Sequence, residues 1–334
     1  MIAVLLGAAA VLGLAVWGAT WAVTRLLVRL EIYDRPNERS SHDAPKPRGG
    51  GLALIPLLLA AWAAWTLWSG SAPAGFWAVL GGAVVLALVS LADDLRGLPA
   101  AVRLAVQAAA VAVGLAGMSE SGLVAQGLLP PLADRLVAGL FWVWFVNLFN
   151  FMDGIDGISG AEASSIAVGL ALVAVVAGLP AARMALALLL VAAALGFLAW
   201  NWPPARVFLG DVGSIPLGYL LGWLLVAAAA EGQWAAALIL PSYYLADATV
   251  TLAKRAARGA KLWQAHREHF YQRAVQGGLS HRAVVQWMLA CNIALIAFAL
   301  WAAAGQPWPA VAGAALAVLA LLAKLRYHAA QRRV

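Results

Sequence analysis

Charged residues are scarce in this chain: they make up 11% of its 334 residues, whereas hydrophobic residues make up 64%. This scarcity excludes an ordinary soluble globular protein, in which about a quarter of the residues are charged. The sequence contains no soluble domain, because its longest polar stretch is about 30 residues, near 254–283. A single cysteine, Cys291, excludes an internal disulfide and a Cys-rich metal site.

Apolar runs recur along the whole chain, and each is long enough to cross the ~30 Å hydrocarbon core of a bilayer as a helix. The first run lacks an Ala-x-Ala cleavage pattern behind a charged leader, so we interpret it as a span rather than a signal peptide. The pattern predicts an all-α polytopic membrane protein with about 11 transmembrane helices in a single domain, 1–334. The predicted spans are roughly 2–24, 52–69, 75–92, 101–117, 136–151, 160–179, 182–200, 213–230, 234–253, 284–304 and 308–324.

The basic residues predict the orientation of these spans. With the N-terminus periplasmic and the C-terminus cytoplasmic, 20 of the 22 Lys and Arg residues fall on the cytoplasmic side, and only Arg135 and Arg183 fall outside. This asymmetry follows the positive-inside rule. The net charge of +7 therefore reflects topology, not nucleic-acid binding, and favours contact with anionic lipids and an anionic substrate. The predicted cytoplasmic loops are about 25–51, 93–103, 152–160, 201–211 and 254–283.

Four polar clusters interrupt the apolar sequence, and all four fall on the predicted cytoplasmic side. Carboxylates beside a bilayer are costly and usually functional. Because several of them occur in short motifs, we predict a site for a divalent metal and phosphate at a membrane face. The clusters are Asp93-Asp94-Leu95-Arg96-Gly97, Asn147 to Gly157, Phe208-Leu209-Gly210-Asp211-Val212-Gly213-Ser214, and His266-Arg267-Glu268-His269.

The second cluster is the most specific. Asn147, Asn150 and Asp153 are spaced by three, so they share one face of a helix. Glycines on both sides of Asp156 loosen the backbone, as close approach to a phosphate requires. Amide and carboxylate oxygens suit Mg²⁺. The alternative is that these residues only cap helix ends.

The first and third clusters each allow two interpretations. The neighbouring carboxylates Asp93 and Asp94 repel each other unless a cation or an Arg is near, or one takes a proton; otherwise they are a solvated helix end. Asp211 opens a predicted helix, where backbone N–H groups favour anions, or it is an N-cap. Phe208 is an interfacial anchor or a stacking platform for a base.

Three further features stay open in the same way. His266, Arg267 and His269 predict phosphate binding, or else belong to a basic amphipathic helix on the membrane surface. The first loop, with Arg48 before a glycine run, binds phosphate or is only a turn-rich connection. Asp247 lies within a predicted span and is either functional or paired with a neighbouring helix.

Together these motifs resemble those of the polyprenyl-phosphate N-acetylhexosamine-1-phosphate transferases, which include MraY, WecA and the eukaryotic dolichyl-phosphate enzyme. The resemblance extends over nearly the whole chain and rests on Asn-x-x-Asn-x-x-Asp-Gly-x-Asp-Gly and Phe-x-Gly-Asp-x-Gly-Ser. It implies transfer of a sugar-1-phosphate from a UDP-sugar to undecaprenyl phosphate, with release of UMP. The implied cofactor is Mg²⁺, or Mn²⁺ in its place.

The resemblance also implies roles for individual residues. Phe208 would stack on uracil, and the His266 loop would contact the diphosphate. The implied metal ligands are Asp211 and Asp153. The implied catalytic carboxylates are Asp93, Asp94, Asp153 and Asp156. The implied substrate-binding residues are Asn147, Asn150, Phe208, His266, Arg267, His269 and Arg48.

The His-Arg-Glu-His loop differs from the His-His-containing loop of MraY and WecA. It resembles the branch that makes O-antigen and capsule precursors from UDP-GlcNAc, UDP-QuiNAc or UDP-FucNAc, which disfavours the MurNAc-pentapeptide donor. The resemblance implies a multi-pass protein of the bacterial inner membrane with its active site facing the cytoplasm. Membrane lipids are expected partners, a homodimer is compatible with the family, and nucleic acid is not expected.

The main alternative function is secondary transport. Eleven spans and glycine-interrupted helices with acidic residues suit a transporter, but transporters place their polar residues near the bilayer midplane. Here the polar clusters fall at the predicted cytoplasmic ends of the spans. A non-catalytic scaffold would leave the acidic clusters unexplained, so we favour the enzyme.

Overall fold

A computed structural model describes residues 1–34, 44–118, 122–261, 264 and 266–331 of the protein. Part of the predicted first loop and part of the last one lie outside these residues. The helices are α1 Ile2–Arg29, α2 Gly51–Ser69, α3 Phe76–Arg96, α4 Ala100–Ala116, α5 Pro131–Phe151, α6 Ile158–Val176, α7 Ala181–Asn201, α8 Asp211–Ala228, the π-helical η1 Ala229–Gln233, α9 Trp234–Ile239, α10 Ser242–Ala257, α11 Phe270–Gln276, α12 His281–Ala303 and α13 Pro307–Gln331. Two short strands, β1 Tyr33–Asp34 and β2 Lys46–Pro47, pair antiparallel.

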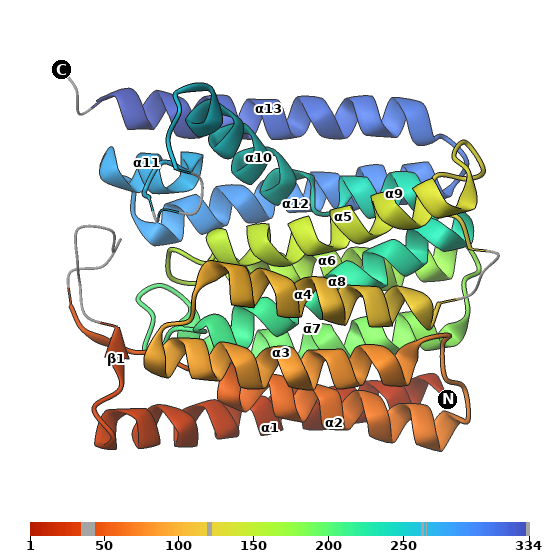
Figure 1. Ribbon diagram of the computed structural model, residues 1–334, viewed down its shortest axis with the longest axis horizontal. Helices are drawn as coiled ribbons and strands as arrows, with labels where there is room; N and C mark the ends of the chain where they lie inside the picture. Colours follow the sequence, from red (N-terminus) through yellow and green to blue (C-terminus); the bar gives the residue numbers. More distant parts are fainter. Residues whose placement is uncertain (35–43, 119–121, 262–263, 265, 332–334) are drawn as a thin grey trace.

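The long helices lie side by side along one axis and form a bundle (Figure 1). This arrangement confirms the predicted all-α polytopic fold. The connections after α1, α3, α5, α7 and α10 gather at one end of the bundle, on the left in Figure 1, and we call this end the polar end. Helix α13 ends at the polar end, and the N-terminus lies at the opposite end. All four polar clusters therefore meet at one end of the molecule.

Nine stretches of the described residues are long and apolar enough to cross a membrane. This count differs from the predicted eleven in two places. α4 is shorter than a typical span, with 17 residues. The stretch Asp211–Ile239 contains Glu231 and Gly232 outside the helical region, and the predicted span 234–253 is divided into α9 and α10 around Pro241.

Helix α8 forms the centre of the bundle. Every residue from Val212 to Ala228 is buried, and α8 packs against α2, α3 and α5. A helix that is apolar on all sides is stable only when it is surrounded by other helices or lipid. The outer helices instead expose large apolar side chains, including Leu14, Leu140 and Leu316, at about 70% exposure each. Such exposure is expected for faces that contact lipid tails.

Two glycines allow α2 to cross the beginning of α8. A Cβ atom on Gly51 would lie 2.3 Å from the Cα atom of Gly213, closer than any side chain allows. The Gly51 N–H donates to the carbonyl oxygen of Leu209 at 2.9 Å. Small residues at helix crossings permit this close backbone approach in membrane proteins. The crossing fixes the segment before α2 next to the beginning of α8.

Replacing Gly51 by alanine is expected to destabilise the protein by about 1–3 kcal/mol, because the added methyl group overpacks the crossing. The thermal unfolding midpoint in detergent measures this effect. Gly81→Ala is the matched control, since a Cβ at Gly81 meets no atom within 4 Å. Equal midpoints for the two variants would contradict the proposed role of the crossing.

Candidate active site

A backbone ladder brings two distant segments together at the polar end. The Phe208 N–H donates to the Pro47 carbonyl oxygen at 2.8 Å, and the Phe208 carbonyl oxygen accepts from the N–H groups of Gly49 and Gly50 at 3.1 and 2.8 Å. Arg48 lies within this ladder as the bridge partner of Phe208. The first loop thus carries Arg48 to the N-terminus of α8.

The Arg48 guanidinium joins two of the predicted acidic residues. Its Nη2 atom lies 2.8 Å from Asp94 Oδ1 and 2.7 Å from Asp211 Oδ1. Burial lowers the pKa of Arg48, but the carboxylates of Asp211 and Asp94 outweigh burial and raise it, so the side chain stays charged. Arg103 extends the pairing, with Nη1 at 2.8 Å from Asp93 Oδ2 and 3.7 Å from Asp211 Oδ2.

Asp94, on α3, caps the N-terminus of α8. Its carboxylate accepts from the backbone N–H groups of Asp211 at 3.3 Å and Val212 at 3.0 Å. A carboxylate at a helix N-terminus is favoured by the unpaired N–H groups and the helix dipole. In this structure the first amides of α8 therefore bind a carboxylate of the protein, and Asp211 is not its own helix cap.

Asp93 and Asp94 are held in different ways, although they are neighbours in sequence. The Asp93 carboxylate accepts from the Leu98 N–H at 2.6 Å and from Arg103. It therefore fixes the turn between α3 and α4. The repulsion expected between the two carboxylates is relieved by separate cations, since Arg103 pairs with one and Arg48 with the other.

Asp153 lies between α5 and α6 and completes an acidic group. Burial raises the pKa of Asp153 to about 7; the neighbouring Ser159 side chain and the charge of Arg48 oppose this rise, whereas Asp211 and Asp94 add to it. Asp153 therefore lies close enough to Asp94 and Asp211 to be affected by their negative charges. We call Asp93, Asp94, Asp153 and Asp211 the carboxylate cluster.

The carboxylate cluster has the chemistry of a divalent cation site, although no three His, Cys, Asp or Glu residues in the described part of the chain form a ready-made metal cage. Its four carboxylates are accompanied by the two guanidinium groups of Arg48 and Arg103. When all are ionised, two negative charges remain, which one divalent cation would balance. Mg²⁺ often uses only one or two carboxylates together with water and substrate phosphates. The predicted Mg²⁺ would use oxygen donors of this kind, and the cofactor stays a prediction.

Asp156 is buried apart from this cluster and has its own partners. Its carboxylate lies 3.0 Å from Lys46 Nζ, 2.9 Å from the Ala205 N–H and 3.4 Å from His281 Nδ1. Burial raises the pKa of Asp156, but these partners outweigh burial and hold the pKa below its usual range. Asp156 thus ties together three loops of the polar end.

The two predicted amide side chains of α5 contact different helices. Asn147 donates through Nδ2 to Gln107 Oε1 of α4 at 2.7 Å, whereas Asn150 donates to Ser214 Oγ of α8 at 2.8 Å. Asn150 therefore lies one turn closer to the beginning of α8. Phe208 is half-buried, and Lys46 Nζ lies 5.2 Å from the centre of its ring. These positions are compatible with substrate binding, which stays a prediction for all three residues.

Asp247 holds the last polar loop. Its buried carboxylate accepts from the N–H groups of Phe270 and Tyr271 at 3.0 and 3.2 Å, and its Oδ1 atom lies 3.1 Å from His269 Nδ1. Asp247 therefore pairs with the neighbouring helix, α11, which is one of the two interpretations left open by the sequence. His269 is only 2% exposed, and this contact fixes the orientation of its ring.

Between α10 and α11, the residues that the structure describes are not helical. The structure therefore does not contain the amphipathic helix that was the alternative interpretation of this loop. The His266 ring lies 5.0 Å from the His269 ring. Burial, with a further contribution from His269, lowers the pKa of His266 to about 4, so this side chain is neutral at pH 7. Arg267 lines a separate groove between α10, α11 and α13.

Four residues at or near these contacts were not singled out from the sequence: Lys46, Arg103, His281 and Glu162. The first three are partners of carboxylates at the polar end. Glu162 is fully buried in α6 and accepts from Asn292 Nδ2 at 2.7 Å. An acid inside a predicted span is itself a signal, and it could have identified Glu162.

Comparison with known proteins places this geometry in a family. The sequence profile of glycosyl transferase family 4 matches residues 76–229, which include the whole carboxylate cluster. A relative from Streptomyces coelicolor described as a glycosyltransferase is 32% identical over 320 residues, covering 92% of this chain and 73% of its own. The chain belongs to glycosyl transferase family 4.

Two further relatives indicate what members of the family do. A Bacillus subtilis protein, described as a probable undecaprenyl-phosphate N-acetylglucosaminyl 1-phosphate transferase, is 29% identical over 280 residues, covering 79% of this chain and 75% of its own. A phospho-N-acetylmuramoyl-pentapeptide-transferase from Streptococcus thermophilus is 38% identical, but over only 114 residues, about a third of each chain. The names of these two relatives thus refer to different sugar groups.

The contacts of Asp156 predict a structural effect that Asp153 does not share. Asp156→Asn leaves Lys46 without its ion-pair partner and is expected to destabilise the protein by about 3 kcal/mol. Asp153→Asn is the matched substitution three residues earlier, and it removes a negative charge from an acidic group. Thermal unfolding should show a lower midpoint for Asp156→Asn only. A larger decrease of the unfolding midpoint in Asp153→Asn than in Asp156→Asn would contradict the structural role assigned to Asp156.

Proposed function

We propose that the protein transfers the sugar-1-phosphate of a UDP-N-acetylhexosamine to undecaprenyl phosphate and releases UMP. The observation that supports this most strongly is the position of the carboxylate cluster and its two arginines at one end of a membrane bundle of family 4. One substrate is water-soluble and the other lies in the membrane, so they can meet at such an end. The B. subtilis relative, described as a transferase of this kind, supports the general reaction.

The transfer exchanges one phosphoanhydride (P–O–P) linkage for another. An oxygen of the lipid phosphate attacks the β-phosphorus of the UDP-sugar, and the bond from that phosphorus to the oxygen of UMP breaks, leaving the electron pair on UMP. Because both reactants are anionic, the main task of the protein is to offset repulsion and hold the groups in line. A bound Mg²⁺ would supply charge neutralisation at the diphosphate.

We assign the residues of the site according to their contacts. Asp211 and Asp153 would hold the metal ion, and Arg48, which contacts Asp94 and Asp211, would bind the diphosphate. Asn150 and Phe208 remain candidates for binding the nucleotide. Asp94 would act by positioning Arg48 and α8, and Asp93 by positioning Arg103. Asp156 and His269 would hold their loops in place.

The orientation in the membrane is part of the proposal. The polar end carries most of the basic loops, and the positive-inside rule would place it in the cytoplasm, where UDP-sugars are found. We therefore propose an inner-membrane enzyme whose site opens toward the cytoplasm and which initiates a lipid-linked surface glycan of the O-antigen or capsule type. The lipid phosphate would reach the cluster from the same side of the bilayer.

Removing a metal ligand or the metal should abolish transfer. UMP release from UDP-GlcNAc and undecaprenyl phosphate is expected to fall at least about 100-fold in Asp211→Asn, because even indirect partners of metal ligands contribute 10- to 100-fold. EDTA should stop the reaction, and Mg²⁺ or Mn²⁺ should restore it. Glu31→Gln, at an exposed carboxylate outside the carboxylate cluster, is the control and should retain activity. Metal-independent turnover would refute the proposed site.

The donor is expected to be a simple N-acetylhexosamine. The relative described with a pentapeptide-bearing sugar covers only about a third of this chain, whereas the N-acetylglucosaminyl relative covers 79%. We expect kcat/KM for UDP-GlcNAc, UDP-QuiNAc or UDP-FucNAc to exceed that for UDP-MurNAc-pentapeptide by about 100-fold or more, a difference of roughly 2.7 kcal/mol. A preference for the pentapeptide donor in the same assay would contradict this expectation.

A further inference from the structure

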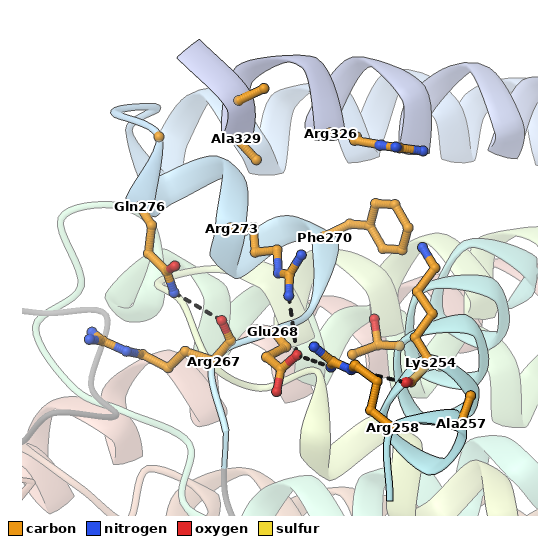
Figure 2. A pocket seen from close by; sticks show the side chains of 13 residues that line it. Lys254, Ala257, Arg258, Arg267, Glu268, Phe270, Arg273, Gln276, Arg326 and Ala329 are labelled. Carbon is orange, nitrogen blue, oxygen red and sulfur yellow. Dashed lines mark hydrogen bonds and ion pairs between the residues drawn. The ribbon is translucent and has the colours of Figure 1, made fainter. Parts of the chain in front are cut away.

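A groove of about 870 Å³ opens at the polar end between α10, α11 and α13 (Figure 2). No member of the carboxylate cluster lines it. It is therefore separate from the proposed transfer site. Its charged lining consists of Lys254, Arg258, Arg267, Arg273, Arg326 and Glu268.

The groove is strongly basic. Among the residues that the structure describes, five cationic side chains and one carboxylate give its lining a formal charge of +4. Glu268 is ionised at neutral pH: burial opposes its charge, but hydrogen bonds from Arg258 and Arg255 outweigh burial and hold the pKa of Glu268 at about 2. Glu268 also pairs with Arg273 at 3.1 Å. A single carboxylate thus organises several arginines without neutralising the groove.

Two of the cations face each other across the groove without a carboxylate partner among the described residues. Arg326 is exposed on α13, and Lys254 is exposed on α10, with its Nζ 4.7 Å from the centre of the Phe270 ring. Figure 2 shows Arg326 on one wall, opposite Phe270 and Lys254 on the other. An anion bound between these walls would connect α13 to α10 and α11.

The residues next to the groove are of the kind found at the level of lipid headgroups. Lys324 Nζ lies 3.8 Å from the centre of the Trp287 ring, and that ring also contacts His328 at 5.1 Å. Tyr327 is 64% exposed. Trp and Tyr next to basic residues are typical of the membrane–water interface. Further along the same helix, Leu316 is 68% exposed, as expected where α13 faces lipid tails.

We propose that this groove is a lipid site that binds the phosphate groups of an anionic phospholipid. A headgroup with two phosphates, as in diphosphatidylglycerol, matches its charge better than one with a single phosphodiester. Basic pockets between transmembrane helices bind such headgroups, and the arginine fork suits phosphate oxygens. The proposal does not depend on the transfer reaction, because it concerns different side chains and a different ligand.

Native mass spectrometry of the full chain, released from detergent micelles with added lipid, tests the site directly. Diphosphatidylglycerol should bind more tightly than phosphatidylglycerol, and phosphatidylethanolamine should bind least. The double variant Lys254→Gln/Arg326→Gln should bind diphosphatidylglycerol about tenfold or more weakly, since each interfacial cation contributes to anionic lipid binding. The same lipid should raise the unfolding midpoint of the wild type but not of the double variant.

Arg206→Gln is the matched control, because Arg206 is an exposed arginine at the polar end that stacks on Trp200 outside the groove. Its lipid binding should equal that of the wild type. The unfolding midpoint without lipid shows whether the double variant is folded, and single variants replace it if it is not. Equal loss in the control, or equal binding of all three lipids, would overturn the proposal.

Undecaprenyl phosphate provides the last comparison. One outcome is that undecaprenyl phosphate binds, that the two substitutions weaken its binding, and that diphosphatidylglycerol does not bind. In that case the groove belongs to the acceptor substrate, and the proposal is wrong. If both substitutions weaken diphosphatidylglycerol and leave undecaprenyl phosphate unaffected, the phospholipid site is established. Because these readouts measure binding, they do not depend on whether transfer is observed.

Discussion

Repulsion between carboxylates at the polar end is the interaction on which the surrounding structure depends. Asp94 is stabilised by two amides of α8 and by Arg48, and Asp93 by Arg103. The ladder to Phe208 holds the first loop and with it Arg48 at this end, and the close crossing of α2 and α8 follows directly after the ladder. The close contact between Gly51 and Gly213 therefore supports the ion pairs of Arg48. A larger separation of α2 and α8 would move the Arg48 guanidinium away from Asp94 and Asp211.

The acidic residues of this end fall into two groups according to the donors that surround them. Asp247 and Asp156 accept from backbone N–H groups and also contact a histidine or Lys46, so each is satisfied by the protein itself. Asp153 and Asp211 belong to a group that retains negative charge after its arginines are counted. Partly buried negative charge that the protein does not neutralise favours binding of a cation or a proton, and such groups are concentrated at functional sites.

Helix positions and the meeting of the polar clusters could be predicted from the sequence, because span length and the placement of Lys and Arg are local properties of the chain. Contacts between distant residues could not. Asp94 caps a helix that begins 117 residues later, and Lys46 pairs with a carboxylate 110 residues away. The spacing in the sequence showed that Asn147 and Asn150 share a helix face. It did not show that Asn147 contacts α4 whereas Asn150, about one turn later, contacts α8. The break between α9 and α10 was not predicted either, because the presence of Pro241 does not by itself fix where one helix ends and the next begins.

A short segment connects the two charged regions of the polar end. Arg267 and Glu268 line the basic groove, whereas the next residue, His269, is buried against Asp247. Asp247 also fixes the first amides of α11, whose Phe270 and Arg273 form one wall of the groove. One buried carboxylate therefore sets the orientation of both the inward-facing histidine and the outward-facing cations. A buried Asp247 carboxylate without these partners would be costly, so we expect its contacts with His269, Phe270 and Tyr271 to form together. The same contacts of Asp247 therefore order the loop before α11 and shape the wall of the groove.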